Sequence, residues 1–185
     1  DGNVLDVRTS DRTIPFGDFA DQCRRARVDI GARGFYKTPG VDFNRETGQG
    51  TPFFYYTTGA AVAEVLIDRF TGDLKVDRVD LLMDIGRPIN PGIDRGQVIG
   101  GFVQGMGYVT AEELKYDATG KLLSYSPTTY KIPGITDIPS IFHVGFIENH
   151  ENGRNVRSSK AVGEPPLMLA LSVWAAVKHA LSCAV

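Results

Sequence analysis

The sequence predicts an α+β fold, in which a mixed sheet with β-hairpins is packed against helices. Two runs rich in β-branched residues flank the turn "TGD" at 71–73, which indicates a hairpin. Apolar residues recur at helical spacing over 15–30, and a long apolar run follows position 164. Because these hairpins and helices do not alternate regularly, a purely parallel α/β sheet is disfavoured.

The elements follow one another in a clear order. A helix is expected over 15–30, then a long loop with short extended pieces over 34–59, and then the hairpin over 60–86. A glycine-rich helix is predicted from about Ile93, followed by a second hairpin over 113–126 that turns at Thr119 and Gly120. A strand is expected over 141–148, and a final helix after Glu164.

Composition narrows the function classes. Apolar residues make up 42% and charged residues 23% of the 185 residues, as in ordinary globular proteins with one domain or two small ones. The net charge of −2 gives no reason to expect nucleic acid or an acidic membrane as partner. Cys23 and Cys183 form no metal or disulfide spacing, which favours a reducing compartment, the cytoplasm.

The two ends of the sequence lack the usual signals. The chain begins at Asp1 rather than methionine, and no turn signal follows its last helical pattern. We therefore expect residues 1–185 to be a single fragment of a longer protein, with boundaries truncated at both ends. No apolar run is long enough to span a bilayer.

Glu164 is the first candidate site residue. It lies between Gly163 and two prolines, Pro165 and Pro166, at the predicted start of the last helix. One interpretation is simple: a carboxylate near a helix N-terminus interacts well with the helix dipole. The other is a positioned general base, because the two prolines remove N–H donors that would otherwise hold the charge. The pattern leaves both interpretations open.

Gln104 is the second candidate. It lies in "GGFVQGMG", where each glycine weakens a helix by about 1 kcal/mol relative to alanine. Such glycines indicate a close approach, either of another helix or of a bulky cofactor that the amide could hydrogen-bond.

Other kinds of site are not supported. The three histidines lack metal-ligand spacing, GxGxxG does not occur, and no GxSxG surrounds a serine. Glu112 and Glu113 are adjacent in sequence and so diverge on a helix. The acids within 84–94 are interpreted as turn and cap residues.

Five motifs together resemble the molybdenum-cofactor-binding subunit of the xanthine dehydrogenase family of molybdenum hydroxylases. They occur in the same order over nearly the whole chain: "GFYKTPG", "GTPFFYYTTGAAVAEVLIDRFTGDLKVDR", "MDIGRPINPGIDRGQVIGGFVQGMGYVTAEELKYD", "PTTYKIPG" and "SKAVGEPPLMLALSVWAAVKHA". The resemblance implies that the α+β fold is part of a molybdopterin-binding domain.

The resemblance also implies a reaction and its site residues. The family hydroxylates purines such as hypoxanthine and xanthine with water as oxygen source. Its molybdenum is held by a pterin dithiolene, so no protein side chain is expected as metal ligand. Glu164 matches the general base that acts on the molybdenum-bound hydroxyl. Gln104 matches a glutamine near the metal, and the backbone at Val162 and Gly163 matches a segment that lines the cofactor cavity.

Further partners follow from the same resemblance. The 2Fe-2S clusters and FAD of the family are expected on other domains or subunits, and most cofactor contacts on upstream molybdenum-binding segments. The isolated chain is therefore expected to be inactive. Two alternatives stay open: an aldehyde oxidase-type molybdenum hydroxylase, and a non-catalytic folding or assembly module.

Overall fold

The computed structural model describes every residue except 1, 6–12, 184 and 185. It divides into two compact units, residues 1–39 and residues 40–185. In the first unit, strands β1 (Asn3–Leu5) and β2 (Thr13–Pro15) pair antiparallel, and helix α1 (Phe16–Arg25) follows directly. The helix predicted over 15–30 is confirmed but ends early, because Arg27 adopts a left-handed conformation (φ 56°).

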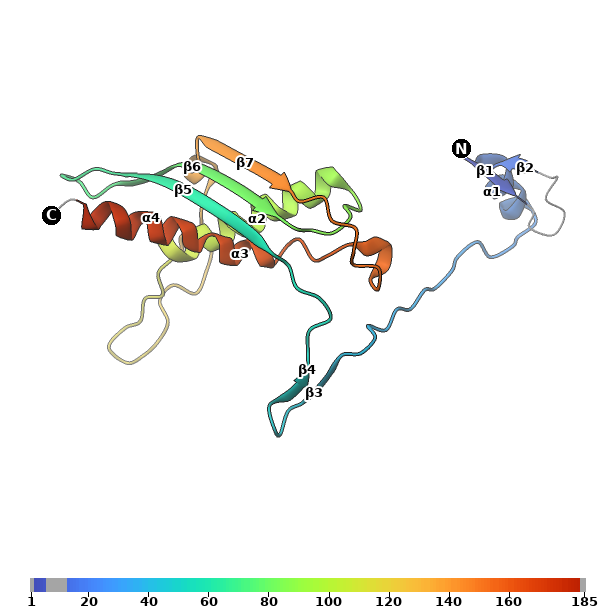
Figure 1. Ribbon diagram of the computed structural model, residues 1–185, viewed down its shortest axis with the longest axis horizontal. Coiled ribbons are helices and arrows are strands. Elements are labelled where there is room, and N and C mark those ends of the chain that lie inside the picture. The colour runs from blue at the N-terminus through green and yellow to red at the C-terminus, as the bar shows by residue number, and fades with distance from the viewer. Residues whose placement is uncertain (1, 6–12, 184–185) are drawn as a thin grey trace. The chain divides into compact units, whose positions relative to one another are not determined.

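The second unit contains a mixed sheet. A short hairpin comes first, made of β3 (Asp42–Asn44) and β4 (Gln49–Thr51) within the predicted long loop. Then β5 (Gly59–Ile67) and β6 (Leu74–Met83) pair antiparallel, and β7 (Ile141–Phe146) adds to β6 in parallel. The sheet order β5-β6-β7 with its helices confirms the predicted α+β class (Figure 1).

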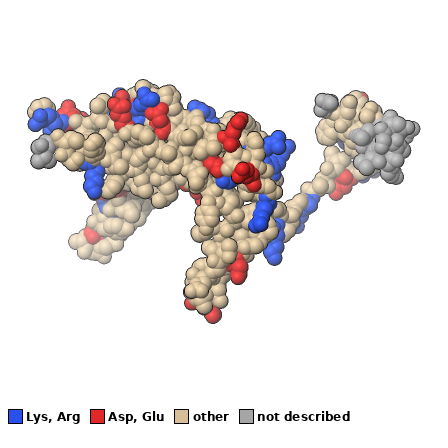
Figure 2. Space-filling model, in the orientation of Figure 1, with Lys and Arg blue, Asp and Glu red and all other residues tan. Residues whose placement is uncertain are grey.

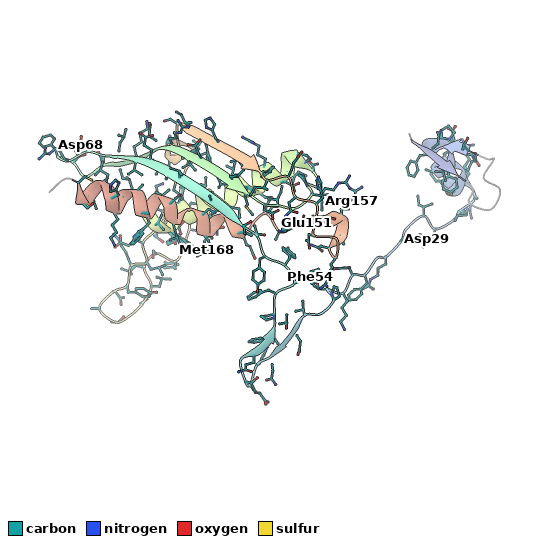
Figure 3. The ribbon with its side chains drawn as sticks, viewed as in Figure 1. Asp29, Phe54, Asp68, Glu151, Arg157 and Met168 are labelled. Atoms are coloured by element: carbon teal, nitrogen blue, oxygen red, sulfur yellow. The ribbon has the colours of Figure 1, made fainter. Side chains whose placement is uncertain are left out.

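The turn between β5 and β6 is the one that the sequence predicts. The Asp68 carboxylate, at the tip of the hairpin (Figure 3), accepts hydrogen bonds from the amides of Phe70 (2.7 Å) and Thr71 (2.9 Å). Gly72 takes the positive φ of 79° that the reversal requires. Local hydrogen bonds and one glycine therefore determine where the hairpin turns.

Three helices cover one face of this sheet: α2 (Pro91–Thr110), α3 (Pro165–Leu169) and α4 (Leu171–Ser182) (Figure 1). The strands alternate, so every second side chain points towards the helices. Fully buried side chains from β6, α2 and α4 form the core, and they include Val79, Met83, Phe102, Met106 and Val173. The core therefore lies between the sheet and the helices.

Helix α2 begins at Pro91, two residues before the predicted start. The Asn90 side chain accepts hydrogen bonds from the amides of Gly92 (3.2 Å) and Ile93 (3.3 Å), while Asp94 accepts from the Asn90 amide (3.1 Å). This reciprocal arrangement is similar to a capping box, with the acidic residue at the fourth helical position, and proline suits the first position because its missing N–H needs no partner there.

Two glycines of α2 explain the glycine-rich pattern. A Cβ on Gly101 would overlap the carbonyl oxygen of Gly163, and one on Gly105 would overlap that of Leu167. Gly101 and Gly105 lie one turn apart on the same helical face, which packs against the segment around α3. On this face of α2 the glycines therefore permit close packing of another chain segment, rather than the approach of a cofactor.

We expect Gly105→Ala to destabilise the protein, although alanine is the better helix former. The new Cβ meets the Ala170 Cβ at 2.8 Å as well as backbone, and overpacking of this kind costs about 1–3 kcal/mol. The matched control is Gly100→Ala, since a Cβ at Gly100 meets no atom within 4 Å and gains up to about 1 kcal/mol. Melting temperatures of the two variants should shift in opposite directions, and equal shifts would contradict this packing.

Two predicted elements differ from the structure. The last helix is divided into α3 and α4 at Ala170, which is fully buried where Gly105 of α2 approaches. The second predicted hairpin turns as expected near Gly120 but keeps only one isolated bridge, Tyr116 with Leu122, and no assigned strands. Short 3-10 turns occupy Ile135–Asp137 (η1) and Val156–Ser158 (η2).

Acidic and basic side chains are mixed over the visible face of the second unit rather than gathered by sign (Figure 2). Within the described residues, every helix is too short or too polar to cross a membrane.

Candidate functional site

Glu164 lies at the N-cap position of α3, with its side chain exposed. Its carboxylate makes no capping hydrogen bond to the helix, and Pro165 and Pro166 occupy the first two helical positions. Glu164 therefore stands where a carboxylate interacts well with the helix dipole, without a hydrogen bond to the first turn, and both interpretations of this residue stay open. The carboxylate is accessible while its backbone belongs to an ordered turn, since the Glu164 carbonyl accepts from the Leu167 amide (3.1 Å).

The residues before Glu164 are attached to the end of β6. The amide of Lys160 donates to the Ile85 carbonyl (2.9 Å), and the amide of Arg87 donates to the Ser158 carbonyl (3.0 Å). Gly86 and Ser159 form an antiparallel bridge. Gly86 has a positive φ (63°), and a Cβ there would overlap the Ser158 carbonyl oxygen. This segment is therefore held by the backbone as a short extension of the sheet.

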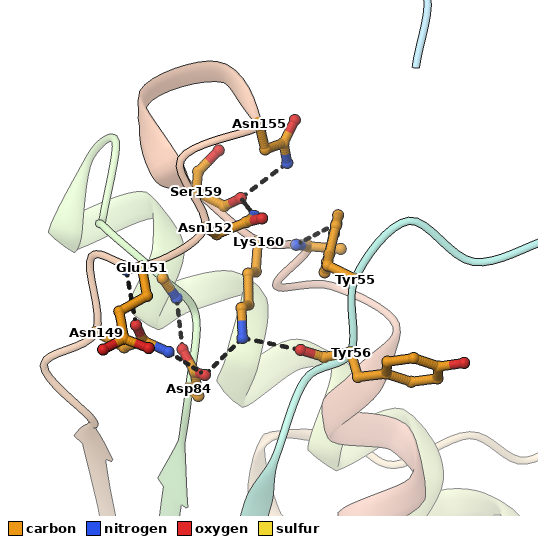
Figure 4. Close-up of polar contacts among 11 residues, drawn as sticks. Tyr55, Tyr56, Asp84, Asn149, Glu151, Asn152, Asn155, Ser159 and Lys160 are labelled. Atoms are coloured by element: carbon orange, nitrogen blue, oxygen red, sulfur yellow. Dashed lines mark hydrogen bonds and ion pairs between the residues drawn. The ribbon is translucent and has the colours of Figure 1, made fainter. Parts of the chain in front are cut away.

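A buried ion pair reinforces this attachment (Figure 4). Lys160 Nζ donates to Asp84 Oδ2 (2.6 Å) and to the carbonyl of Tyr56 (2.8 Å). The side chains of Lys160 and Asp84 are only 10% and 6% exposed, so the pair is shielded from water. The other contacts of Asp84 come from the Gly86 amide (2.8 Å) and from Asn149 Nδ2 (2.8 Å).

These contacts determine the charge state of Asp84. Burial by itself raises the pKa of the Asp84 carboxyl, but the hydrogen bonds from Lys160, Gly86 and Asn149 outweigh it and lower the pKa below its usual value. The sequence predicts a turn role for Asp84, which explains only the hydrogen bond that its carboxylate accepts from the Gly86 amide. The pairing with Lys160 was missed, because 76 residues separate the partners and no local pattern signals such a contact.

Gln104 lies elsewhere on α2, in the wall of a cavity of about 430 Å³. Tyr130 and Glu112 also line this cavity, and Tyr130 donates a short hydrogen bond to the Glu112 carboxylate. That hydrogen bond, together with burial and the nearby charge, raises the pKa of Tyr130 to about 12. The lining of this cavity therefore includes the neutral phenol of Tyr130, the carboxylate of Glu112 and the exposed amide of Gln104.

The predicted site residues are not brought into one cavity, and of the three near the start of α3 only Gly163 is placed directly against α2. Gly163 packs against Gly101 of α2, one turn before Gln104, and half-buried Val162 packs against the core. The lining of the Gln104 cavity includes neither Glu164 nor Val162 nor Gly163. The Gln97 side chain, which the sequence did not single out, also lies close to Gly163: its Oε1 would be 3.2 Å from a Cβ placed on that glycine.

Helix α2 also offers an open face. Cβ atoms added at Gly96 and Gly100 would meet nothing within 4 Å, and Gln104 follows on the same side one turn later. A bulky, flat group could approach the bare backbone here and hydrogen-bond the amide. In the described part of the chain, no three His, Cys, Asp or Glu side chains are placed to hold a metal ion.

Comparison with known families identifies the family of this chain. The sequence model of the molybdopterin cofactor-binding domain matches residues 1–139. This chain belongs to that family. The matched residues include Gln104 and the whole glycine-rich helix, whereas Glu164, Val162 and Gly163 lie beyond them.

Relatives of this molybdopterin cofactor-binding domain extend the similarity over both regions. It is 46% identical to a xanthine dehydrogenase of Oryza sativa subsp. japonica over 91% of its own length, and 49% identical to the xanthine dehydrogenase/oxidase of Rattus norvegicus over 93%. In both cases the chain spans only 13% of the relative.

Solved structures show the same fold in related enzymes. Quinoline 2-oxidoreductase from Pseudomonas putida 86 matches 98% of this chain with a TM-score of 0.66 and 26% identity, and the chain covers 22% of it. Aldehyde oxidoreductase from Desulfovibrio gigas matches 85% of this chain with a TM-score of 0.66 and 28% identity, and the chain covers 17% of it. The fold is thus that of a molybdopterin-binding domain, as the resemblance implied.

Proposed function

We propose that this chain is part of a molybdenum hydroxylase of the xanthine dehydrogenase type, which oxidises purines such as hypoxanthine and xanthine with water as the oxygen source. The observation that carries the proposal is Glu164, an exposed carboxylate without a capping role on a segment attached at both ends. The relatives named xanthine dehydrogenase support this type, since they are 43–49% identical whereas the aldehyde oxidoreductase is 28% identical.

The chemistry assigns a simple task to Glu164. A ring carbon–hydrogen bond becomes a carbon–hydroxyl bond, the oxygen comes from water, and two electrons and two protons are released. Molybdenum on its pterin supplies the two-electron acceptor when it is bound. The Glu164 carboxylate takes a proton from the oxygen nucleophile as general base. Pro165 and Pro166 restrict the backbone beside it, which keeps the carboxylate in a defined place.

Other residues of the chain have supporting roles in this proposal. The Gln104 amide would hydrogen-bond the cofactor, and the backbone at Val162 and Gly163 would line its site. The 2Fe-2S clusters and FAD lie on other domains or subunits and carry electrons away. A cytoplasmic location in purine metabolism is part of the same proposal.

A substrate panel tests the proposed activity. The complete enzyme that carries this chain, loaded with molybdenum, should oxidise hypoxanthine and xanthine with higher kcat/KM than any aldehyde. Oxygen-18 from labelled water should appear in the product. A preference for aldehydes would favour the aldehyde oxidase type instead, to which the Desulfovibrio gigas neighbour points. If the molybdenum-loaded enzyme oxidises neither purines nor aldehydes, the result would favour the alternative in which this chain is a non-catalytic assembly module.

A further inference from the structure

The segment that carries Glu164 has an unusual set of attachments before that residue. The chain enters it through two consecutive non-glycine residues with positive φ, Arg157 (53°) and Ser158 (58°). Left-handed conformations at such residues are strained, and they persist where surrounding contacts determine the backbone. Side chains of Asn152 and Asn155 both donate to the Ser159 carbonyl at 2.8 Å (Figure 4).

The Asp84–Lys160 ion pair lies at the centre of these contacts, four residues before Glu164. A buried ion pair adds little net stability compared with a well-packed apolar pair, because desolvation offsets the attraction. The best-supported role of such pairs is to select one arrangement of two chain segments. Here the two segments are the end of β6 and the approach to Glu164.

The aromatic stretch before β5 completes the attachment. Lys160 Nζ also donates to the Tyr56 carbonyl (2.8 Å), and the Ala161 amide donates to the Tyr55 hydroxyl (2.8 Å). After Ala161, the next attachment is Gly163 on Gly101 of α2. Glu164 therefore follows directly after a stretch that contacts first the sheet and then helix α2.

We propose that Lys160 and Asp84, with Tyr55, are positioning residues that set the place of the Glu164 carboxylate through the backbone of 160–164. This inference rests on the proposed function of Glu164. None of the three touches the reacting atoms. Their effect should therefore disappear when Glu164 can no longer act as a base, whereas a purely structural effect would remain.

A double-mutant cycle in the complete enzyme tests this directly. Lys160→Met should lower kcat for xanthine about 10- to 100-fold, the size expected when a catalytic group shifts by about 1 Å, with KM changed less than about threefold. In the Glu164→Gln background the same substitution should change kcat less than about twofold. Lys75→Met, which breaks the exposed pair with Asp77, should be silent in both backgrounds.

Hydrogen exchange supplies a readout that does not depend on activity. Lys160→Met should speed exchange of the amides over 158–164, without loss of molybdenum per protein. Tyr55→Phe removes only the bond to the Ala161 amide and should show the same pattern, about 3- to 10-fold in kcat, even if Lys160→Met fails to fold. Equal losses of kcat in both backgrounds would overturn the positioning role. If Glu164→Gln alone leaves kcat unchanged, the proposed function fails first.

Discussion

Replacing Glu164 with glutamine in the complete enzyme is expected to lower kcat for xanthine about 10²- to 10⁴-fold. Glutamine has nearly the same shape but cannot accept a proton from the oxygen nucleophile. Since the Glu164 side chain is exposed and does not cap the helix, the loss should not come from unfolding. The melting temperature and the molybdenum content should therefore stay at wild-type values.

The pH profile separates a base from a binding group. A general base must accept a proton and the amide of the variant cannot, so the pH dependence of kcat/KM should differ between the wild type and Glu164→Gln. Steady-state kinetics across pH on both proteins makes the comparison.

Glu113→Gln is the matched control. Glu113 is an exposed glutamate that pairs only loosely with Lys115 (3.2 Å) on the surface. Its replacement should leave kcat and the pH profile unchanged. A Glu164→Gln enzyme that turns over xanthine within a factor of a few of wild type would remove Glu164 from the mechanism.

Local signals made much of the fold predictable. The turn at 71–73 contains an aspartate and a glycine whose preferences agree with the hairpin, and β5 and β6 alternate as half-buried strands do. The start of α2 was predicted two residues late, although Asn90 and Pro91 are residue types that favour a helix start. In each case the cause lies within a few residues of the effect.

The differences arise where distant residues decide. Nothing in the apolar run after Glu164 signals a break, yet the helix divides at Ala170, which lies against Gly105 from another part of the chain. The glycine-rich pattern of α2 was visible in the sequence, but the roles of individual glycines depend on residues that are distant in sequence. Gly101 faces the backbone of Gly163, whereas Gly100 faces open space. The roles of Glu164 and Gln104 remain predictions from resemblance.

The second large effect concerns stability. Asp84→Leu leaves the Lys160 ammonium buried without its partner, which is expected to cost about 3–5 kcal/mol. Because both side chains are at most 10% exposed, water cannot replace the lost carboxylate. Native-state hydrogen exchange of the amides on β6 in the complete protein measures this as a fall in protection of about 10²- to 10⁴-fold.

Removing both charges should reverse much of that loss. Asp84→Leu with Lys160→Met leaves no buried charge, so the double variant should lose far less than the sum of the two single variants. Strictly additive losses would show that the two side chains do not interact. Asp77→Ala, which removes an exposed pair with Lys75, should cost no more than about 1 kcal/mol.

The pH dependence of this contribution has a definite sign. The folded protein lowers the pKa of Asp84 below the ordinary value of 3.8, so the unfolded chain binds the proton more readily. The stabilisation is therefore fully present above pH 3.8 and is lost as the pH falls through the lower folded-state pKa. The stability difference between wild type and Asp84→Asn should stay constant from about pH 5 to 8 and shrink in acid. A difference that grows as the pH falls would mean that Asp84 is protonated in the folded protein and that Lys160 has no anionic partner.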